Sequence, residues 1–266
     1  MPGLPKRKER FGLNSNGKLA AVILAAGEGK RMKSSIPKVL HELRGKPLLS
    51  YVIEAAYSVH ADPIVIIASP RTSEIRRLAS ESKTVVAVQP EPRGTGDAVR
   101  WAQPHVESFH GDILILCGDA PLITGSLLVS LVRLHRTTNA EATILTAELE
   151  DATGYGRIVR NETGNVIRIV EQADASESET AIREVNTGAY CFTPAALFET
   201  LGELKTDNAQ GEFYLTDVIE SLVRRQAVVQ AFSMGTPRAP LGINTPQDLE
   251  ETARALDLES GRTLLK

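Results

Sequence analysis

The sequence predicts an α/β protein built on a doubly wound, mostly parallel sheet with an added antiparallel β lobe. Two observations support this prediction. In the first 150 residues, short apolar runs without alternation are separated by segments of helical spacing, the pattern of parallel strands covered by helices on both faces. After residue 150, turn-rich segments between short strand patterns indicate antiparallel pairing.

The expected parallel strands are continuous apolar runs at Leu19–Leu24, Ile64–Ala68, Thr84–Val88, Ile113–Cys117 and Ala142–Ala147. Because successive positions in each run are apolar, both faces of each strand need cover. The crossover helices are expected at Leu48–Val59, Glu74–Ser80 and Ser126–Arg136. This β-α-β-α order predicts that ligands bind at loops beyond the carboxyl ends of the strands.

The second half is expected to add a β-hairpin and further helices. Arg157–Arg160 and Val166–Val170 flank a turn-rich stretch and form the predicted hairpin. Asp174–Thr180 is expected to be a polar loop. Helical spacing predicts helices at Pro194–Leu201, Leu215–Arg225 and Pro246 to about Leu258. We expect one sheet to run through both halves, giving one domain with two lobes.

Composition and charge exclude several protein classes. The chain of 266 residues carries 30 basic and 33 acidic side chains, which excludes a strongly basic nucleic-acid binder. Apolar residues at 42% and charged residues at 24% argue against wholesale disorder and coiled coils. Without a long apolar run or a signal peptide, the chain is expected to be cytoplasmic, with no membrane or nucleic-acid partner. Cys117 and Cys191 lie in apolar runs and are expected to be buried free thiols.

A glycine-rich loop, Leu24–Met32, follows the first expected strand. Small residues let the backbone approach a ligand closely, and successive N–H groups can point at phosphate oxygens. A P-loop is excluded because Arg31 follows Lys30 where Ser or Thr is required. A dinucleotide fingerprint is excluded because Met32 stands where Gly or Ala is needed.

Several cations accompany this loop: Lys30, Arg31, Lys33 and Lys38. In a chain of net negative charge, this local concentration favours a polyphosphate site, with a tight turn or a solvated charged loop as the alternative readings.

Further motifs narrow the choice of protein family. They are Gln89–Gly96, Cys117–Leu122, Gly154–Arg157, Val170–Glu171, Val185–Gly188, Asn208–Asp217 and Gly242–Asn244. In order and spacing, over about residues 19–250, the chain resembles sugar-1-phosphate nucleotidyltransferases. Within that family it is similar to the N-terminal uridylyltransferase (pyrophosphorylase) domain of the bacterial bifunctional GlmU proteins. The resemblance implies a Rossmann-like, GT-A-like nucleotidyltransferase fold.

The resemblance also implies an activity. It is the Mg²⁺-dependent transfer of UMP from UTP to N-acetylglucosamine 1-phosphate, giving pyrophosphate and UDP-N-acetylglucosamine, a cell wall precursor. One alternative is a related nucleotidyltransferase that uses another nucleoside triphosphate or another sugar phosphate acceptor. A second is a catalytically silent nucleotide-binding module.

Roles for individual residues follow from the resemblance. It makes Arg31, Lys38 and Asp119 catalytic, and Asp119 and Asn244 the ligands of Mg²⁺, a cation that prefers oxygen donors. The nucleotide would contact Leu24, Ala25, Ala26, Gly27, Gly29, Gln89, Gly94 and Thr95. The sugar would contact Gly156, Glu171, Asn186, Tyr214 and Thr216.

Some of these residues also have ordinary structural readings. Asp119 could cap a helix starting near Thr124, and Asn244 could belong to a turn or a helix N-cap. Glu171 could be a solvent-facing strand residue and Asn186 a bulge residue. Gln89 suits uracil because one amide carries both an acceptor for N3–H and a donor for a carbonyl oxygen.

The chain departs from the family pattern at Lys30, Arg93, Asp97, Cys117 and Ala173, where Thr, Leu, His, Tyr and Lys are usual. The change at Cys117 bears on the sugar pocket and leaves the acceptor sugar open.

The expected organisation is a flexible basic tail at 1–18, a nucleotidyltransferase domain at 19–248 and a C-terminal helical segment at 249–266. Within the domain, the nucleotide lobe is expected at about 19–124 and the sugar lobe at about 125–248. Hexapeptide repeats are absent, so no β-helix acetyltransferase domain is expected. The oligomeric state is left open.

Overall fold

The computed structural model describes residues 17–27, 29–70, 73–106 and 109–263. Most of the expected tail at 1–18 therefore lies outside the described residues, and Lys18 already begins the first strand. The strands of the main sheet are β1 (Lys18–Ala25), β4 (Ile64–Ala68), β5 (Val85–Val88), β6 (Gly111–Cys117), β7 (Ala142–Glu148), β8 (Arg157–Arg160), β9 (Val166–Val170), β10 (Glu184–Phe192) and β11 (Val229–Ser233).

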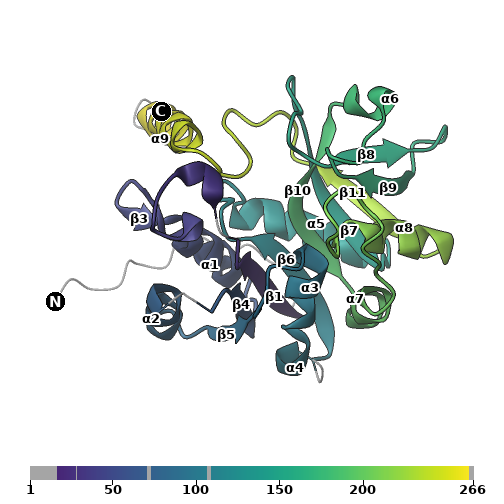
Figure 1. Ribbon diagram of the computed structural model, residues 1–266, viewed down its shortest axis with the longest axis horizontal. Helices are drawn as coiled ribbons and strands as arrows, with labels where there is room; N and C mark the ends of the chain where they lie inside the picture. Colours follow the sequence, from purple (N-terminus) through teal and green to yellow (C-terminus); the bar gives the residue numbers. More distant parts are fainter. Residues whose placement is uncertain (1–16, 28, 71–72, 107–108, 264–266) are drawn as a thin grey trace.

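The main sheet is mixed but mostly parallel, and its strands follow the order β11-β7-β10-β6-β1-β4-β5 (Figure 1). β10 alone runs against its neighbours in this path, between β6 and β7, and β8 and β9 extend from it as the predicted hairpin. The sheet thus joins strands from both halves of the chain, as expected, whereas the division into two lobes stays a prediction. The predicted strands agree with the observed ones to within one or two residues at each end.

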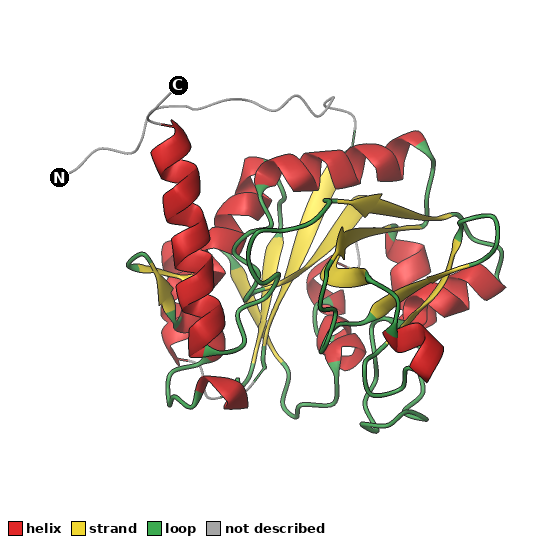
Figure 2. Cartoon of the chain, turned by 90° about the horizontal axis from the view of Figure 1, so that it is seen from above, coloured by secondary structure: helices red, strands yellow, loops and turns green. Residues whose placement is uncertain are grey.

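Helices cover both faces of the sheet (Figure 2). α1 (Leu48–Ser58), α2 (Ser73–Glu81) and α5 (Gly125–Thr137) pack on one face, and α3 (Thr95–Arg100), α4 (Gln103–Val106), α7 (Pro194–Leu201) and α8 (Asp217–Arg224) pack on the other. In β1, Ile23 contributes to the first core and Val22 to the second, and both are fully buried. The doubly wound α/β fold is therefore confirmed, because a strand that feeds two cores must be apolar at successive positions.

The predicted polar loop at Asp174–Thr180 is wrong in part, since it contains the short helix α6 (Glu177–Thr180). Ser176 accepts a hydrogen bond from the Glu179 backbone N–H, and the Glu179 carboxylate accepts one from the Ser176 backbone N–H. This reciprocal capping box stabilises a helix too short to show apolar periodicity. The spacing of Ser176 and Glu179 was the signal that could have predicted it.

The C-terminal helix α9 (Pro246–Thr263) packs beside a small sheet of β2 (Glu42–Leu43) and β3 (Lys46–Pro47) (Figure 1). Leu43, Leu48 and Ile243 form the buried centre of this contact. The contact fixes the segment before α9 against the main sheet, where the Ile243 N–H donates to the Asp119 carbonyl at 2.9 Å. In the described parts of the chain, no helix is long and apolar enough to cross a bilayer.

Candidate active site

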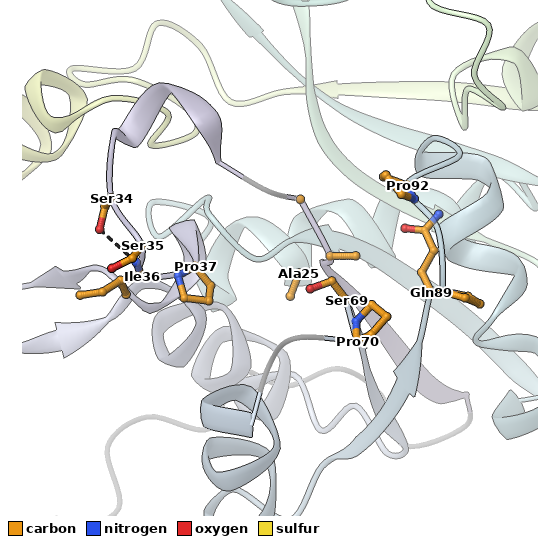
Figure 3. Close-up of a pocket in the computed structure, with 12 residues that line it drawn as sticks. Ala25, Ser34, Ser35, Ile36, Pro37, Ser69, Pro70, Gln89 and Pro92 are labelled. Carbon is orange, nitrogen blue, oxygen red and sulfur yellow. Dashed lines mark hydrogen bonds between the residues drawn. The ribbon is translucent and has the colours of Figure 1, made fainter.

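A cleft opens at the carboxyl ends of β1, β4, β5 and β6. It consists of adjoining cavities of about 610 Å³ and 570 Å³, which share the lining residues Ala25, Ala26, Gly27, Gln89 and Pro92. Figure 3 shows the second cavity, with Gln89 on one side and Ile36 and Pro37 on the other. β1 pairs with β4 on one edge and β6 on the other, so the cleft lies where the chain switches direction across the sheet. Ligands of open α/β sheets bind at such points.

The glycine-rich loop forms one wall of this cleft and brings Lys38 back to the end of β1. Gly29 has a φ of +62°, a left-handed conformation that favours glycine. A Cβ at Gly29 would lie 2.6 Å from the Cβ of Lys38, so a side chain does not fit there. This close approach places the base of Lys38 against the loop that precedes it.

The Lys38 ammonium bridges the two residues predicted as metal ligands. Its Nζ donates to Asp119 Oδ2 and, at 3.0 Å, to Asn244 Oδ1. Arg31 Nη2 also donates to Asn244 Oδ1, at 2.9 Å. The side chains of Lys38 and Asp119 are only 16% and 15% exposed, so this ion pair is largely shielded from water. Four residues from three separate parts of the chain therefore meet at one point.

Asp119 and Asn244 are free for this arrangement because other residues cap the nearby helices. Thr124 caps α5, accepting a hydrogen bond from the Leu127 N–H, so Asp119 is not the cap. At the start of α9, Thr245 accepts from the Asp248 N–H, so the Asn244 side chain is not the cap there. Asn244 Nδ2 donates to the Gly242 carbonyl at 3.1 Å, which turns Oδ1 toward Lys38.

The donor set of this cluster fits a hard divalent cation. Asp119 Oδ2 and Asn244 Oδ1 converge on a single positively charged atom, the Lys38 Nζ. Mg²⁺ binds one or two protein oxygens and completes its shell with water and phosphate oxygens. The two oxygens therefore have the chemistry and the convergence that such an ion needs.

The larger cavity gathers every residue that the sequence assigned to the nucleotide, the catalytic set and the metal. Its lining includes Leu24, Ala25, Ala26, Gly27, Gly29, Arg31, Lys38, Gln89, Gly94, Thr95, Asp119 and Asn244. Of the other expected cations, Lys33 is exposed and the Lys30 side chain lies outside the described part of the chain. The assigned roles stay predictions, but their residues share one cavity.

Gln89 differs from the expectation that one amide serves uracil as both donor and acceptor. It lies just past β5 and is 5% exposed. Its Nε2 donates to Asp97 Oδ2 at 2.8 Å and to the Gly94 carbonyl at 3.2 Å. The amide nitrogen therefore already donates its hydrogen bonds inside the protein, and only the amide oxygen remains to accept one from a ligand.

Gly94 holds the other side of the same turn. It has a φ of +104°, and a Cβ there would lie 2.5 Å from the Phe213 carbonyl oxygen, so only glycine fits. The Thr95 hydroxyl accepts a hydrogen bond from the Leu215 N–H at 3.0 Å. The turn is thereby tied to the segment that precedes α8.

Four residues of the expected sugar set lie next to one another. The Asn186 N–H donates to the Gly156 carbonyl at 2.8 Å, and Thr216 Oγ1 donates to Glu171 Oε1 at 2.9 Å. A Cβ at Gly156 would lie 3.5 Å from Glu171 Oε2. Tyr214 and Glu171 line a separate cavity of about 270 Å³. These residues do not line the larger cavity itself.

Cys117, Gly188 and Asn186 join the sugar set to the larger cavity. Cys117 lines that cavity, and its Sγ lies 3.6 Å from the Gly188 carbonyl oxygen. The ladder between β10 and β7 shifts register between Asn186 and Tyr190, so Asn186 does lie at a bulge. Gly188 N–H donates to Asn186 Oδ1 at 3.0 Å and Asn186 Nδ2 donates to Tyr190 Oη at 2.6 Å, which fixes the amide.

Burial raises the pKa values of two side chains in this region. Burial raises the pKa of the Cys117 thiol to about 12, with Asp119 adding to the effect, so the thiol stays protonated and is a poor nucleophile. Burial also raises the pKa of the Glu171 carboxyl, and the nearby carboxylates of Asp174 and Glu212 raise it further. Glu171 is half-buried rather than solvent-facing.

Sequence reasoning missed several lining residues. Ser34, Ser69 and Pro70 line the second cavity, and Glu212 lines the first. Asp97 was noted only as a departure from the family pattern, although it contacts Gln89. No local pattern marks these residues, because they reach the cleft from several strand ends and loops far apart in the sequence.

A second polar cluster lies at the opposite end of the sheet. The ligand atoms of Asp112, His135 and Cys191 lie within 4.8 Å of one another. Arg136 Nε, however, donates to Asp112 Oδ2 at 2.6 Å, and burial raises the pKa of the Cys191 thiol well above its usual value. A protonated thiol is a poor ligand for a cation, and none of the three residues lines the cavities described above, so we interpret this cluster as structural.

Comparisons with known proteins agree with the geometry. A family model described as "Nucleotidyl transferase" matches residues 20–237. "Bifunctional protein GlmU" of Pelotomaculum thermopropionicum is 46% identical over 254 residues, covering 93% of this chain and 55% of that protein. The protein of the same name in Bacillus subtilis is 40% identical over 252 residues, covering 92% and 55%. The chain thus spans about half the length of the curated relatives it matches.

One solved structure supports the fold. It is described as "The Crystal Structure of UDP-glucose pyrophosphorylase complexed with UDP-glucose" and has a TM-score of 0.72. The match covers 91% of this chain and 99% of that one. Because the sequence identity is 17%, this likeness concerns the fold alone.

Proposed function

This chain belongs to the nucleotidyl transferase family, and on that premise we propose that it transfers UMP from UTP to N-acetylglucosamine 1-phosphate. The products are pyrophosphate and UDP-N-acetylglucosamine. The relatives named GlmU, at 40% and 46% identity, support this choice of substrates. UTP is an intracellular metabolite, which supports a cytoplasmic location for the reaction.

The observation that carries the proposal is the convergence of Arg31, Lys38, Asp119 and Asn244 beside a glycine-rich loop in one cavity. Transfer of a nucleotidyl group requires two anions to approach each other and leaves charge on the departing pyrophosphate. Arg31 and Lys38 supply positive charge for the phosphates, and the backbone of Gly27 and Gly29 lets them come close. The protein's task is therefore mainly to position the reactants and neutralise their charge.

Mg²⁺ is the cofactor we propose, held by Asp119 and Asn244. When bound, it supplies charge neutralisation for the phosphate oxygens as the leaving group departs. Asn244 is oriented for this role by its hydrogen bond to Gly242, and Asp119 by the backbone contact to Ile243. When Asp119 and Asn244 bind the metal instead of the Lys38 ammonium, Lys38 can bind a phosphate oxygen.

The acceptor sugar is proposed to lie between the larger cavity and the group formed by Gly156, Glu171, Asn186 and Thr216. Fixed amide, hydroxyl and carboxylate groups of this kind suit sugar hydroxyls and an acetamido group. Cys117 lies between this group and Asp119. The sugar's phosphate oxygen would then face the α-phosphorus of UTP from the side of β10.

The test is a substrate panel with pyrophosphate release as the readout. Four nucleoside triphosphates are each combined with N-acetylglucosamine 1-phosphate, glucose 1-phosphate and galactose 1-phosphate at millimolar Mg²⁺. We expect UTP with N-acetylglucosamine 1-phosphate to give the highest kcat/KM. A preference for another nucleotide or another sugar would refute that part of the proposal, and tight UTP binding without turnover would indicate a silent binding module.

A further inference from the structure

Gln89 and Asp97 form a buried pair at the edge of the cleft. Gln89 is 5% exposed and Asp97, in the first turn of α3, is 9% exposed. The Gln89 Nε2 donates one hydrogen bond to Asp97 Oδ2 at 2.8 Å and one to the Gly94 carbonyl at 3.2 Å. An amide nitrogen carries two protons, so both are used.

The partners of Gln89 determine which way its amide faces. A backbone carbonyl only accepts hydrogen bonds, and so does an ionised carboxylate. If the amide turned over, its oxygen would face two acceptors, and two buried groups would lose their partner. Asp97 and Gly94 therefore hold the nitrogen inward.

The Gln89 oxygen is consequently the group offered to a ligand. In Figure 3 this oxygen points toward Ala25 and Ser69 across the cavity, and the nitrogen points away from them. Gln89 lines both adjoining cavities. Among the residues that the structure describes, no group donates to this oxygen.

We propose that Asp97 is a positioning residue that makes Gln89 a pure hydrogen-bond acceptor, and that this pair selects uracil over cytosine. The inference rests on the proposed function, since it concerns the base of the same nucleotide. Uracil presents an N–H at position 3, which donates to the Gln89 oxygen. Cytosine presents an unprotonated nitrogen there, so two acceptors would face each other beside a side chain that is only 5% exposed.

The size of the expected selectivity follows from the cost of a mismatched polar contact. Sites built to hydrogen-bond one substrate group reject an analogue that lacks it by factors of about 10⁴, and a single partly solvated contact gives less. We expect kcat/KM for UTP to exceed that for CTP by at least about 100-fold in the wild-type protein.

The decisive variant is Asp97→Asn, which keeps the shape of the side chain and adds a donor. Because asparagine can donate to the Gln89 oxygen, only the longer contact to the Gly94 carbonyl, at 3.2 Å, still opposes a turned amide, which would present its N–H groups to the cavity. We expect the UTP to CTP ratio of kcat/KM to fall at least tenfold, with the activity on CTP rising. A ratio equal to that of the wild type would overturn the inference.

Two matched variants control this measurement. Asp97→Glu keeps an acceptor-only carboxylate and should retain the preference for UTP. Glu91→Gln removes one negative charge from an exposed position in the loop that follows Gln89, and should leave the ratio unchanged. Loss of selectivity in Glu91→Gln would mean that net charge, not the orientation of the Gln89 amide, determines the preference for UTP over CTP.

A measurement on the wild-type protein needs no variant to fold. Calorimetry compares the binding of UTP with that of CTP, whose N3 carries no proton, without acceptor sugar. We expect at least about tenfold weaker binding of CTP. Equal affinities would overturn the inference even if Asp97→Asn is unstable. Absence of UTP turnover would refute the proposed function, whereas this binding comparison would still test whether the Gln89 oxygen selects uracil over cytosine.

Discussion

β6 carries an aspartate near each end, and the two carboxylates differ in their surroundings. Asp112, near the start of the strand, has a side chain that is 18% exposed, and Asp119, just past its end, is 15% exposed. Burial alone therefore does not distinguish them. Asp112 is held by fixed side chains of α5, whereas Asp119 pairs directly with Lys38 in the lining of a cavity of about 610 Å³.

The cluster around Asp112 connects three elements. Arg136 of α5 donates to Asp112 Oδ2 at 2.6 Å and also to the carbonyls of Gly17 and Lys18 at the start of β1. His135 Nε2 lies 3.6 Å from Asp112 Oδ1, and its Nδ1 lies 3.0 Å from the Thr143 hydroxyl. These contacts join β1, β6 and α5, and Asp112 lines none of the three cavities described above. Such a cluster stabilises the fold.

The difference between the two ends follows from the direction of the strands. At the carboxyl ends of β1, β4, β5 and β6, loops of varied conformation leave the sheet and enclose the cleft. At their amino ends, α5 returns and packs its last turn directly on the sheet. The same residue type therefore belongs to the candidate active site at one end and to the structural framework at the other.

The largest effect that we expect comes from Asp119→Asn. This change removes a charge proposed to hold the metal, and it should lower turnover by at least ~100-fold, the ~3 kcal/mol typical of one transition-state stabiliser. The melting temperature should stay within a few degrees of wild type. Steady-state kinetics with calorimetric melting measures both, and full activity would mean that the metal is held elsewhere.

The converse change is Asp112→Ala. It leaves Arg136 and His135 without their shared carboxylate, and breaking a largely buried ion pair costs about 3 kcal/mol of unfolding free energy. For a chain of this size that corresponds to a melting temperature lower by roughly 6–12 °C. Turnover at 25 °C should change less than about threefold. A loss of activity without a loss of stability would contradict the assignment of Asp112 to the structural framework and of Asp119 to the candidate active site.

β10 allows the two ends of the sheet to be compared within one strand, because it runs from the candidate site to the structural cluster. We expect Asn186→Ala, at the site end, to raise KM for the sugar phosphate about tenfold, the equivalent of one lost hydrogen bond of ~1.4 kcal/mol, with a smaller change for UTP.

Cys191→Ala, at the other end of the same strand, is the control. It should leave both KM values unchanged and lower the unfolding free energy by about 1 kcal/mol. Equal effects of the two variants on the sugar KM would contradict the assignment of Asn186.

The smallest expected effect is a pH dependence of stability. Burial alone would raise the pKa of Asp112, but the interactions with His135 and Arg136 outweigh it and hold the pKa below its usual value. The unfolded state then binds a proton more readily than the folded state. The stabilisation is therefore complete above the unfolded pKa and is lost as the pH falls through the lowered folded pKa.

Denaturant unfolding between pH 5 and pH 2 measures this effect in wild type and Asp112→Asn. The variant should lose less stability than the wild type over that range. Parallel curves would show that Asp112 does not titrate differently in the folded protein.

Much of the fold was predictable because buried strands have a local sequence pattern, a short run of apolar residues bounded by turn residues. The runs at Ile64–Ala68 and Val166–Val170 were predicted at their observed bounds, since apolar continuity and turn residues are visible within a few positions. α6 was missed because four residues show no period. β10 was also missed, since no strand was predicted over Glu184–Phe192, and its antiparallel direction depends on where it inserts between β6 and β7.

The candidate site was predictable only as a set of residue types. Motif resemblance supplied Lys38, Asp119 and Asn244, and the structure brings them together although they are separated by 81 and 206 positions from Lys38. The pairing of Asp97 with Gln89 was not foreseen, because the sequence does not show which atoms of a side chain are already bonded.

By itself, the sequence determined the acidic net charge, which is a sum over its residues. It also determined the alternation of strands and helices and the presence of a cationic glycine loop, since these depend on near neighbours in the chain. The tertiary structure alone decided which of two aspartates at the ends of one strand lines a cavity and which pairs with a guanidinium. It also decided which half of the Gln89 amide is available to a ligand. The physical reason is that hydrogen bonds and ion pairs form between atoms that folding brings within about 3 Å of each other, whatever their distance along the chain.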